Sequence, residues 1–197
     1  MARPRSFDAE AFLDHAMDVF WRRGFAATSM ADIYEATGLG ASSIYAFVKD
    51  KNALFQSVFE RYIDGFRKSL PTDVTGGAAI EYWMRGFANS LADDPVRKGC
   101  LIGNTIMERF AHSQETLDLA QALLEEVRNW MQQQIAAGQA QGDYRRDIDP
   151  ALASTVLAAT TLGMMAMARA QASRETLLQI AENAAFALFP VGQQPAR

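Results

Sequence analysis

Apolar residues recur every three or four positions along most of the 197-residue chain, the spacing of helices that bury one face. Phe12, Ala16 and Phe20 begin the pattern, and Gly24 is a natural helix end. The pattern predicts an all-α protein of about nine helices. The expected helices span residues 8–24, 29–38, 41–49, 51–70, 78–92, 100–111, 114–140, 150–171 and 173–189.

Turn-forming residues fill positions 71–77 and predict a domain boundary there. We therefore expect a first domain over residues 1–50, a connecting helix over 51–70 and a second helical domain over 71–189. Residues 190–197 follow the last helix and are expected to form a disordered tail.

Two short helices joined by a tight turn are expected at about residues 31–49. Ser29 and Asp32 have the S-x-x-D spacing of a capping box, in which each residue bonds the backbone of the other, so a helix should begin there. Gly38 ends that helix, and Gly40 is expected to let the chain reverse sharply. Helix-turn-helix proteins use this arrangement to place the second short helix in the DNA major groove.

The second short helix has the composition of a DNA-reading element. Its exposed face is expected to carry small side chains, which let a helix approach base edges closely. Tyr45 should lie outside the core, where its phenol can donate to a phosphate, and Lys51 can add a charged phosphate contact. The predicted DNA-binding residues are Thr28, Ser29, Ala41, Ser42, Ser43, Tyr45, Ala46, Phe47 and Lys51.

This segment resembles the tetracycline-repressor (TetR) family of transcriptional regulators. The family pattern T-x-x-x-I-x-x-x-x-G-x-x-x-x-x-x-Y-x-x-F-x-x-K-x-x-L is matched by Thr28, Asp32-Ile33, Gly38, Tyr45, Phe47 to Val48, Lys51 and Leu54. Val48 departs from it, because the family usually has an aromatic residue there. The resemblance covers about the first third of the chain. It implies a homodimer formed through the last two helices and a second domain whose small-molecule inducer releases double-stranded operator DNA.

The formal charge of -4 is unusual for a DNA-binding protein, but it is unevenly spread. Residues 1–70 hold nine Lys/Arg and nine Asp/Glu, so the acidic excess lies in the rest of the chain. Arg3 and Arg5 precede the first helix, where they could reach DNA as an N-terminal arm does or remain solvated.

The chain has one cysteine and an N-terminus without an apolar signal core, so we expect a cytoplasmic protein. Residues 151–168 carry no charge, but their alanines and hydroxyl residues make them only weakly apolar. They predict a buried helix rather than a membrane span.

The last two helices carry small and apolar residues on more than one face, which favours burial against a second copy of the chain. A monomeric core is the alternative. The predicted dimer-interface residues are Val156, Ala159, Gly163, Met167, Ile180, Ala184 and Leu188.

Aromatic and methionine side chains in the second domain suit a hydrophobic ligand pocket, although each also suits an ordinary core. Asn104 and Glu108 could orient a ligand or lie on an exposed face. The predicted ligand-binding residues are Trp83, Phe87, Cys100, Asn104, Met107, Glu108, Trp130 and Met164.

Cys100 follows Arg97 and Lys98 at an expected helix start, where cations and the helix dipole would lower its thiol pKa. The surrounding G-C-L-I-x-N-T-x-x-E sequence resembles the branch of the family that contains NemR-like electrophile sensors. Sensing and simple packing are both compatible with this position.

The sequence shows no metal-ligand spacing, catalytic pair or cofactor motif, so we expect neither enzyme activity nor a cofactor. A ligand-responsive transcriptional regulator, most simply a repressor, fits best. Two alternatives are a helical protein-interaction module with a vestigial DNA reader and a small helical enzyme that uses Cys100.

Overall fold

The computed structural model describes residues 8–190, without the side chains of residues 41–43. Within this part of the chain it contains nine α-helices, one short 3-10 helix and no strand, which confirms the all-α prediction. The helices are α1 (Ala9–Arg23), α2 (Met30–Thr37), α3 (Ala41–Phe47), α4 (Lys51–Arg67), α5 (Gly77–Asp93), α6 (Leu101–Met107), η1 (Arg109–Ala111), α7 (Gln114–Gln141), α8 (Pro150–Arg169) and α9 (Arg174–Phe186).

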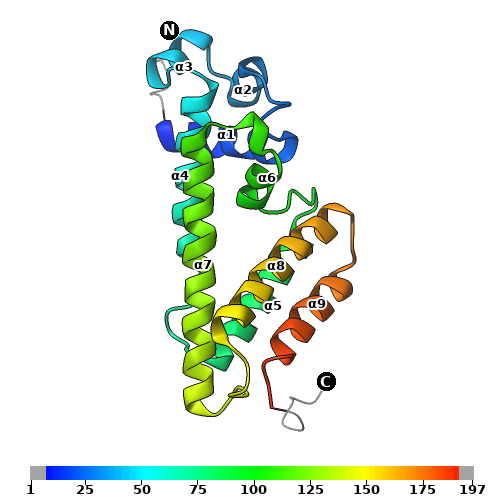
Figure 1. Cartoon of the computed structure of the whole chain (residues 1–197). Helices are drawn as coiled ribbons and strands as arrows, with labels where there is room; N and C mark the ends of the chain where they lie inside the picture. The colour runs from blue at the N-terminus through cyan, green and yellow to red at the C-terminus, as the bar shows by residue number, and fades with distance from the viewer. Residues whose placement is uncertain (1–7, 191–197) are drawn as a thin grey trace.

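The molecule is elongated, with α1, α2 and α3 gathered at one end and α5, α8 and α9 at the other (Figure 1). The long helices α4 and α7 contact each other and run between the two ends. Arg67 Nε on α4 donates to Glu126 Oε2 on α7 at 3.0 Å and joins these helices at the far end of α4. The chain crosses from the first part to the second through α4.

The small N-terminal bundle closes over large apolar side chains. Phe20, Ile33, Ile44 and Leu54, one from each of α1 to α4, are fully buried. Gly24 follows α1 with a φ of 83°, and its amide bonds the carbonyl of Phe20 at 2.8 Å. Only glycine adopts such a conformation without strain, so the chain can leave α1 abruptly here.

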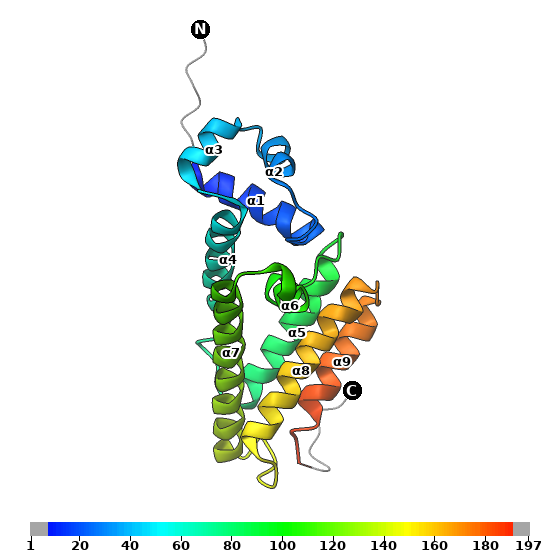
Figure 2. The ribbon, with the colours of Figure 1, turned by 45° about the horizontal axis from the view of Figure 1, so that its top comes forward.

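The second domain is built mainly from α5 packed on α9 and α7 packed on α8. Figure 2 shows α5, α8 and α9 as neighbouring, roughly parallel rods beside α7. Tyr144 follows α7, is almost completely buried, and donates from its hydroxyl to the carbonyl of Gly77 at 2.9 Å. That bond fixes the start of α5 against the turn between α7 and α8.

Several predicted ends differ from the structure. The helix predicted over 51–70 ends at Arg67, and the helix predicted over 173–189 ends at Phe186. The helix predicted over 100–111 divides into α6 and η1, because the backbone leaves helical geometry at Glu108, with a φ of -93° and a ψ of 23°. Apart from Pro190, the expected tail lies outside the described residues, and so do Arg3 and Arg5.

Candidate DNA-binding surface and buried cavity

The capping box predicted at the start of α2 is present. Asp32 N donates to Ser29 Oγ at 3.2 Å, and Ser29 N donates to Asp32 Oδ2 at 2.7 Å. The bonds from Ser29 hold the pKa of the Asp32 carboxyl below its usual value. Ser29 is exposed, but its hydroxyl also donates to Asp32 at 2.6 Å. The hydroxyl is therefore used to cap α2, whatever contact it makes with DNA.

The turn between α2 and α3 is made at Gly38, which has a left-handed φ of 67°. The sequence assigned the reversal to Gly40, and this was wrong: Gly40 has an extended φ of -72° and precedes α3. Leu39 lies between them and packs against the core. These two short helices are therefore fixed relative to each other by one glycine turn and one apolar side chain.

One side of α3 is anchored and the other is open to solvent. Ile44 and Val48 are buried, whereas Tyr45 and Phe47 keep 53% and 42% of their surface exposed and Ala46 is exposed too. Residues 41–43 form the first turn of α3, but the side chains of Ala41, Ser42 and Ser43 lie outside the described residues. The described part of α3 matches the expected orientation of a reading helix.

Two aromatic pairs pack the exposed side of α3 against α1 and α2. The Tyr45 ring lies 6.3 Å from that of Tyr34 on α2, and a hydrogen bond with Tyr45 raises the pKa of Tyr34 to about 12. Phe47 meets Phe12 of α1 edge to face, with ring centroids 5.6 Å apart. Phe47 is therefore partly a packing residue.

Two predicted DNA contacts have structural partners instead. Thr28 is buried, with 2% exposure, and its hydroxyl donates to the carbonyl of Gly24 at 2.7 Å, so its prediction as a surface contact was wrong. Lys51 Nζ donates to the carbonyls of Phe25 at 3.0 Å and Thr28 at 2.9 Å. These two bonds use two of the three N–H donors of the ammonium.

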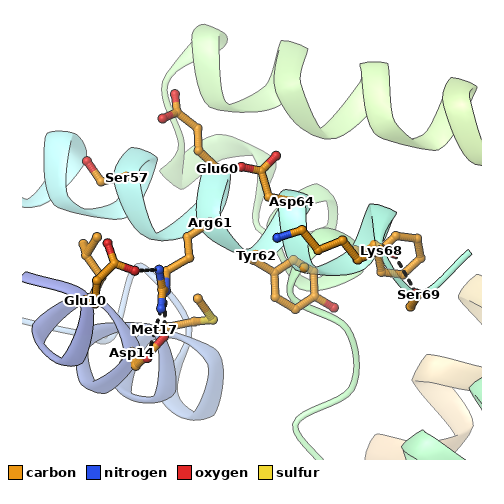
Figure 3. A pocket seen from close by; sticks show the side chains of 13 residues that line it. Glu10, Asp14, Met17, Ser57, Glu60, Arg61, Tyr62, Asp64, Lys68 and Ser69 are labelled. Carbon is orange, nitrogen blue, oxygen red and sulfur yellow. Dashed lines mark hydrogen bonds and ion pairs between the residues drawn. The ribbon is translucent and has the colours of Figure 1, made fainter.

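An open groove of about 800 Å³ runs between α1 and α4 (Figure 3). Arg61 on α4 reaches across it to α1, where it donates from Nε to Asp14 at 2.7 Å and pairs with Glu10. This hydrogen bond from Arg61 holds the pKa of the Asp14 carboxyl below its usual value. The ion pairs of Arg61 add a polar contact between α1 and α4.

A small buried cavity of about 30 Å³ lies between α4, α5, α6, α7 and α8. Three of the predicted ligand-binding residues, Trp83, Phe87 and Cys100, line it together. The other lining residues lie outside the predicted set of ligand contacts, because apolar side chains of a core and of a pocket have the same periodicity. These are Phe66, Ile102, Leu123, Leu124, Val127, Ala158, Thr161 and Met165.

The other predicted ligand residues lie elsewhere. Trp130 packs beside Trp83, with ring centroids 5.9 Å apart, outside the cavity lining. Met164 is fully buried, but its neighbour Met165 lines the cavity in its place. Asn104 donates from Nδ2 to the carbonyl of Lys98 at 2.9 Å, in the segment before α6.

The last two predicted ligand residues, Met107 and Glu108, lie at the far end of α6. Met107 is 84% exposed and cannot contact a ligand in the cavity. The Glu108 carboxylate accepts from the backbone amide of Phe25 at 2.9 Å, in the turn between α1 and α2. Successive turns of α6 carry both residues away from Cys100, so neither lines this cavity.

The surroundings of Cys100 oppose ionisation. Burial raises the pKa of its thiol, outweighing the hydrogen bonds from the Tyr62 hydroxyl and the amides of Gly103 and Ile102, which lower it. The Tyr62 hydroxyl donates to Sγ at 3.2 Å. The expected cations are engaged elsewhere: Arg97 bonds the Leu91 carbonyl, and Lys98 pairs with Asp18. The predicted lowering of the thiol pKa was wrong.

The predicted dimer residues divide between two environments. Val156, Ala159, Gly163 and Met167 lie on the exposed side of α8. On α9, Ile180 and Ala184 are half-buried. Leu188, just after α9, is 4% exposed and belongs to the core of the protomer, so it is not available to a partner. Pro150–Arg169 is long and apolar enough to cross a membrane by length and composition alone, and a third of its apolar stretch is buried within the chain.

Comparison with known proteins agrees with this architecture. Residues 12–58 match the family described as bacterial regulatory proteins, tetR family, and residues 76–184 match the tetracyclin repressor-like C-terminal domain. The HTH-type transcriptional repressor ComR of Escherichia coli strain K12 is 33% identical over 187 residues, which cover 91% of this chain and 88% of ComR.

Solved structures show the same fold. The TetR family regulator CifR, in a cysteine-mutant form complexed with 26-base-pair double-strand operator DNA, has a TM-score of 0.79 at 26% identity, covering 96% of this chain and all of CifR. Reduced NemR of Escherichia coli has a TM-score of 0.80 at 18% identity, covering 95% of this chain and 98% of NemR, and shares the fold. The helix-turn-helix, the helical second domain and both family matches together establish that this chain belongs to the TetR family of transcriptional regulators.

Proposed function

We propose that this regulator represses transcription by binding a palindromic operator as a homodimer and that a small apolar inducer releases it. The observation that carries the proposal is α3: Ile44 and Val48 anchor one side, while Tyr45 and Ala46 face solvent on the other. A helix held in this way can enter a major groove about 12 Å wide. CifR, a relative of the same fold, binds its operator as double-stranded DNA.

The buried cavity is the best candidate for the inducer site. Its walls are aromatic and aliphatic, with Thr161 as a polar exception whose hydroxyl donates to the carbonyl of Ala158 at 2.7 Å. A volume of about 30 Å³ holds only one or two water molecules. An inducer must therefore push the lining apart, and it shifts the population only if it prefers the expanded form.

The alternatives fit less well. A vestigial reader would not need the exposed phenol of Tyr45 on a helix that is otherwise firmly anchored. A thiol enzyme would need an ionised nucleophile, but Cys100 is buried and its hydrogen-bond partner Tyr62 is itself a donor with a raised pKa. The exposed phenol of Tyr45 and the buried thiol of Cys100 therefore both favour a DNA-binding protein over these alternatives.

Selection of bound DNA from a random pool tests the proposal. We expect an inverted repeat whose half-sites are about one helical turn apart, because a two-fold dimer presents two α3 helices. Retention of all sequences equally would contradict it. Changes at Ser42 and Ser43 are expected to alter the selected sequence.

A matched pair of variants tests the orientation of α3. Tyr45→Phe removes one hydroxyl and should weaken binding by roughly 2- to 10-fold, about equally for all operators, because a phosphate contact carries no sequence information. Tyr82→Phe, at a position on α5 that is 70% exposed, is the control and should bind as the wild type does. Equal affinity of the two variants would remove Tyr45 from the interface.

A further inference from the structure

The second domain touches the DNA-reading domain through the Glu108 carboxylate. Glu108 Oε2 accepts from the amides of Phe25 at 2.9 Å and Ala26 at 3.4 Å, both in the turn that joins α1 to α2. Gly24 begins this turn, and a Cβ atom there would run into the carboxylate. The turn is thus shaped to receive Glu108 at close range.

Lys51 holds the other side of the same turn. It donates to the carbonyls of Phe25 and Thr28, and Nζ lies 4.2 Å from the centroid of the Phe25 ring. Phe25 therefore has both its amide and its carbonyl bound by charged side chains from outside the turn. Because the turn sets where α2 begins, these two bonds fix α2 and α3 relative to α4 and α6.

The segment before α6 is fastened to the first domain as well. Trp21 Nε1 donates to the carbonyl of Gly99 at 3.1 Å, and Lys98 Nζ lies 3.0 Å from Asp18 Oδ1. Both partners, Trp21 and Asp18, belong to α1. The short helix α6 is therefore attached to the DNA-reading domain in front of its first turn and after its last.

The N-terminal end of α6 also forms part of the cavity wall. Cys100 and Ile102 line the cavity, and Glu108 follows Ile102 by less than two helical turns, about 9 Å along the axis. The middle of α6 is tightly packed, because a Cβ atom at Gly103 would lie 2.9 Å from the sulfur of Met165. Because α6 is packed this closely against α8, expansion of the cavity at Cys100 displaces α6. That displacement weakens the hydrogen bonds of Glu108 to the α1–α2 turn.

We propose that Glu108 is a positioning residue that couples the cavity to the DNA reader. This inference rests on the proposed function. The contact is made in the form with a closed cavity, so operator binding should favour closure and closure should favour operator binding. The coupling can be measured without an inducer, because Cys100 is the only cysteine and its burial makes alkylation a report of opening.

The experiment compares the rate of Cys100 alkylation by iodoacetamide with and without saturating operator DNA. For the wild type we expect at least a fivefold slower reaction on DNA, the lower end of ordinary coupling between sites. Glu108→Ala removes the carboxylate that accepts both amides and should bring the ratio close to one. Glu108→Gln keeps one acceptor oxygen and should retain an intermediate ratio.

Glu126→Ala is the matched control. It also removes a carboxylate that joins two helices, through Arg67, but it lies far from the α1–α2 turn. We expect the wild-type ratio. Operator saturation is checked for every variant by fluorescence anisotropy, and folding is checked by thermal unfolding.

The outcomes separate the inference from the proposed function. A wild type that binds operator but shows no protection, or a Glu108→Ala variant that keeps full protection, overturns the coupling. Folded Glu108 variants that fail to bind operator, while Glu126→Ala binds, support the positioning role directly. If the wild type selects no operator at all, the proposed function fails and this inference fails with it.

Discussion

Cys100 shows how burial overrides local sequence. Its neighbours Arg97 and Lys98 are cationic, yet their charges are directed to the carbonyl of Leu91 and to Asp18. The thiol is 3% exposed and faces apolar walls, which disfavour the thiolate. Its sulfur instead accepts a hydrogen bond from Tyr62. The residue is therefore suited to packing in this closed form.

We predict that Cys100 reacts slowly in the folded protein. At pH 7.4 its alkylation by iodoacetamide should be at least about tenfold slower than in urea, because both exposure and thiolate fraction are reduced. Mass spectrometry of quenched samples measures the two rates, with the urea sample as the reference for a free thiol. Equal rates in both conditions would restore the electrophile-sensor hypothesis.

Lys51 should contribute to stability even without DNA. Lys51→Met keeps most of the aliphatic stem but leaves the carbonyls of Phe25 and Thr28 without their charged donor. Hydrogen bonds to charged groups contribute about 1.5–3 kcal/mol, so we expect the free energy of unfolding to fall by about that amount in urea denaturation. Lys49→Met, at an exposed position just before α4, is the control and should leave it unchanged.

Sequence alone could identify which residues are able to contact DNA or a ligand, but not which of them already form hydrogen bonds within the protein. Thr28, Lys51 and Glu108 carry groups that suit phosphates or ligands, and all three bond the backbone around the α1–α2 turn instead. Glu108 and Phe25 are 83 positions apart, and no local pattern connects them. Tyr45, Ile44 and Val48 were predictable because their orientation follows from helical periodicity.

At the scale of elements, helix starts were the most predictable feature. Asp8, Ser29, Asp50, Ser113 and Asp149 each accept a backbone amide at a helix start, and such caps are visible in the sequence. The end of α6 was not predictable, because the chain leaves helical geometry at Glu108, the residue that reaches to the other domain. Tertiary contacts decided that boundary.

The segment between α6 and α7 carries a half-buried histidine, His112. The His112 ring lies 4.7 Å from the centroids of both Phe25 and Phe55, and its buried Nδ1 has no hydrogen-bond partner among the described residues. Burial lowers the pKa of His112, Lys51 lowers it further, and Glu108 opposes the change. The neutral form is thus the one that fits this interface.

This shift predicts a loss of stability on mild acidification. The unfolded chain protonates His112 near pH 6.5, whereas the folded chain resists protonation to lower pH. The contribution of His112 is therefore present above about pH 6.5 and is lost as pH falls through the folded pKa. Urea unfolding between pH 7.5 and 5 should show a steeper loss for wild type than for His112→Phe.

His15→Phe is the control for that experiment, since His15 is exposed on α1 and is the other of the two histidines. It should keep the wild-type slope. The carboxylate of Asp32, whose pKa is lowered by Ser29 and Arg23, loses its contribution only at lower pH and equally in all three proteins. Identical slopes for wild type and His112→Phe would mean that another group titrates.

At the scale of the whole molecule, one face of the second domain is apolar and uncovered. Leu152, Val156 and Met167 on α8 keep 64%, 57% and 42% of their surface exposed, with Ala159 and Gly163 between them. Their spacing of three or four residues forms one stripe along the helix, the pattern of a helix–helix seam. Such a stripe predicts a partner, and a second copy satisfies the two-fold symmetry that a palindromic operator requires.

We predict that Gly163→Arg abolishes the dimer and, with it, tight operator binding. A Cβ atom at Gly163 meets nothing within 4 Å, so the protomer can accept the side chain, whereas a partner helix packed there could not without burying an unpaired charge. Gly86→Arg is the matched control, because Gly86 is an exposed helical glycine of α5 with equally open surroundings. Sedimentation should show monomers only for Gly163→Arg, with normal thermal unfolding of both variants. A Gly163→Arg protein that remains dimeric would place the interface on another face, and a monomer that still binds the full operator tightly would show that repression does not need the pair.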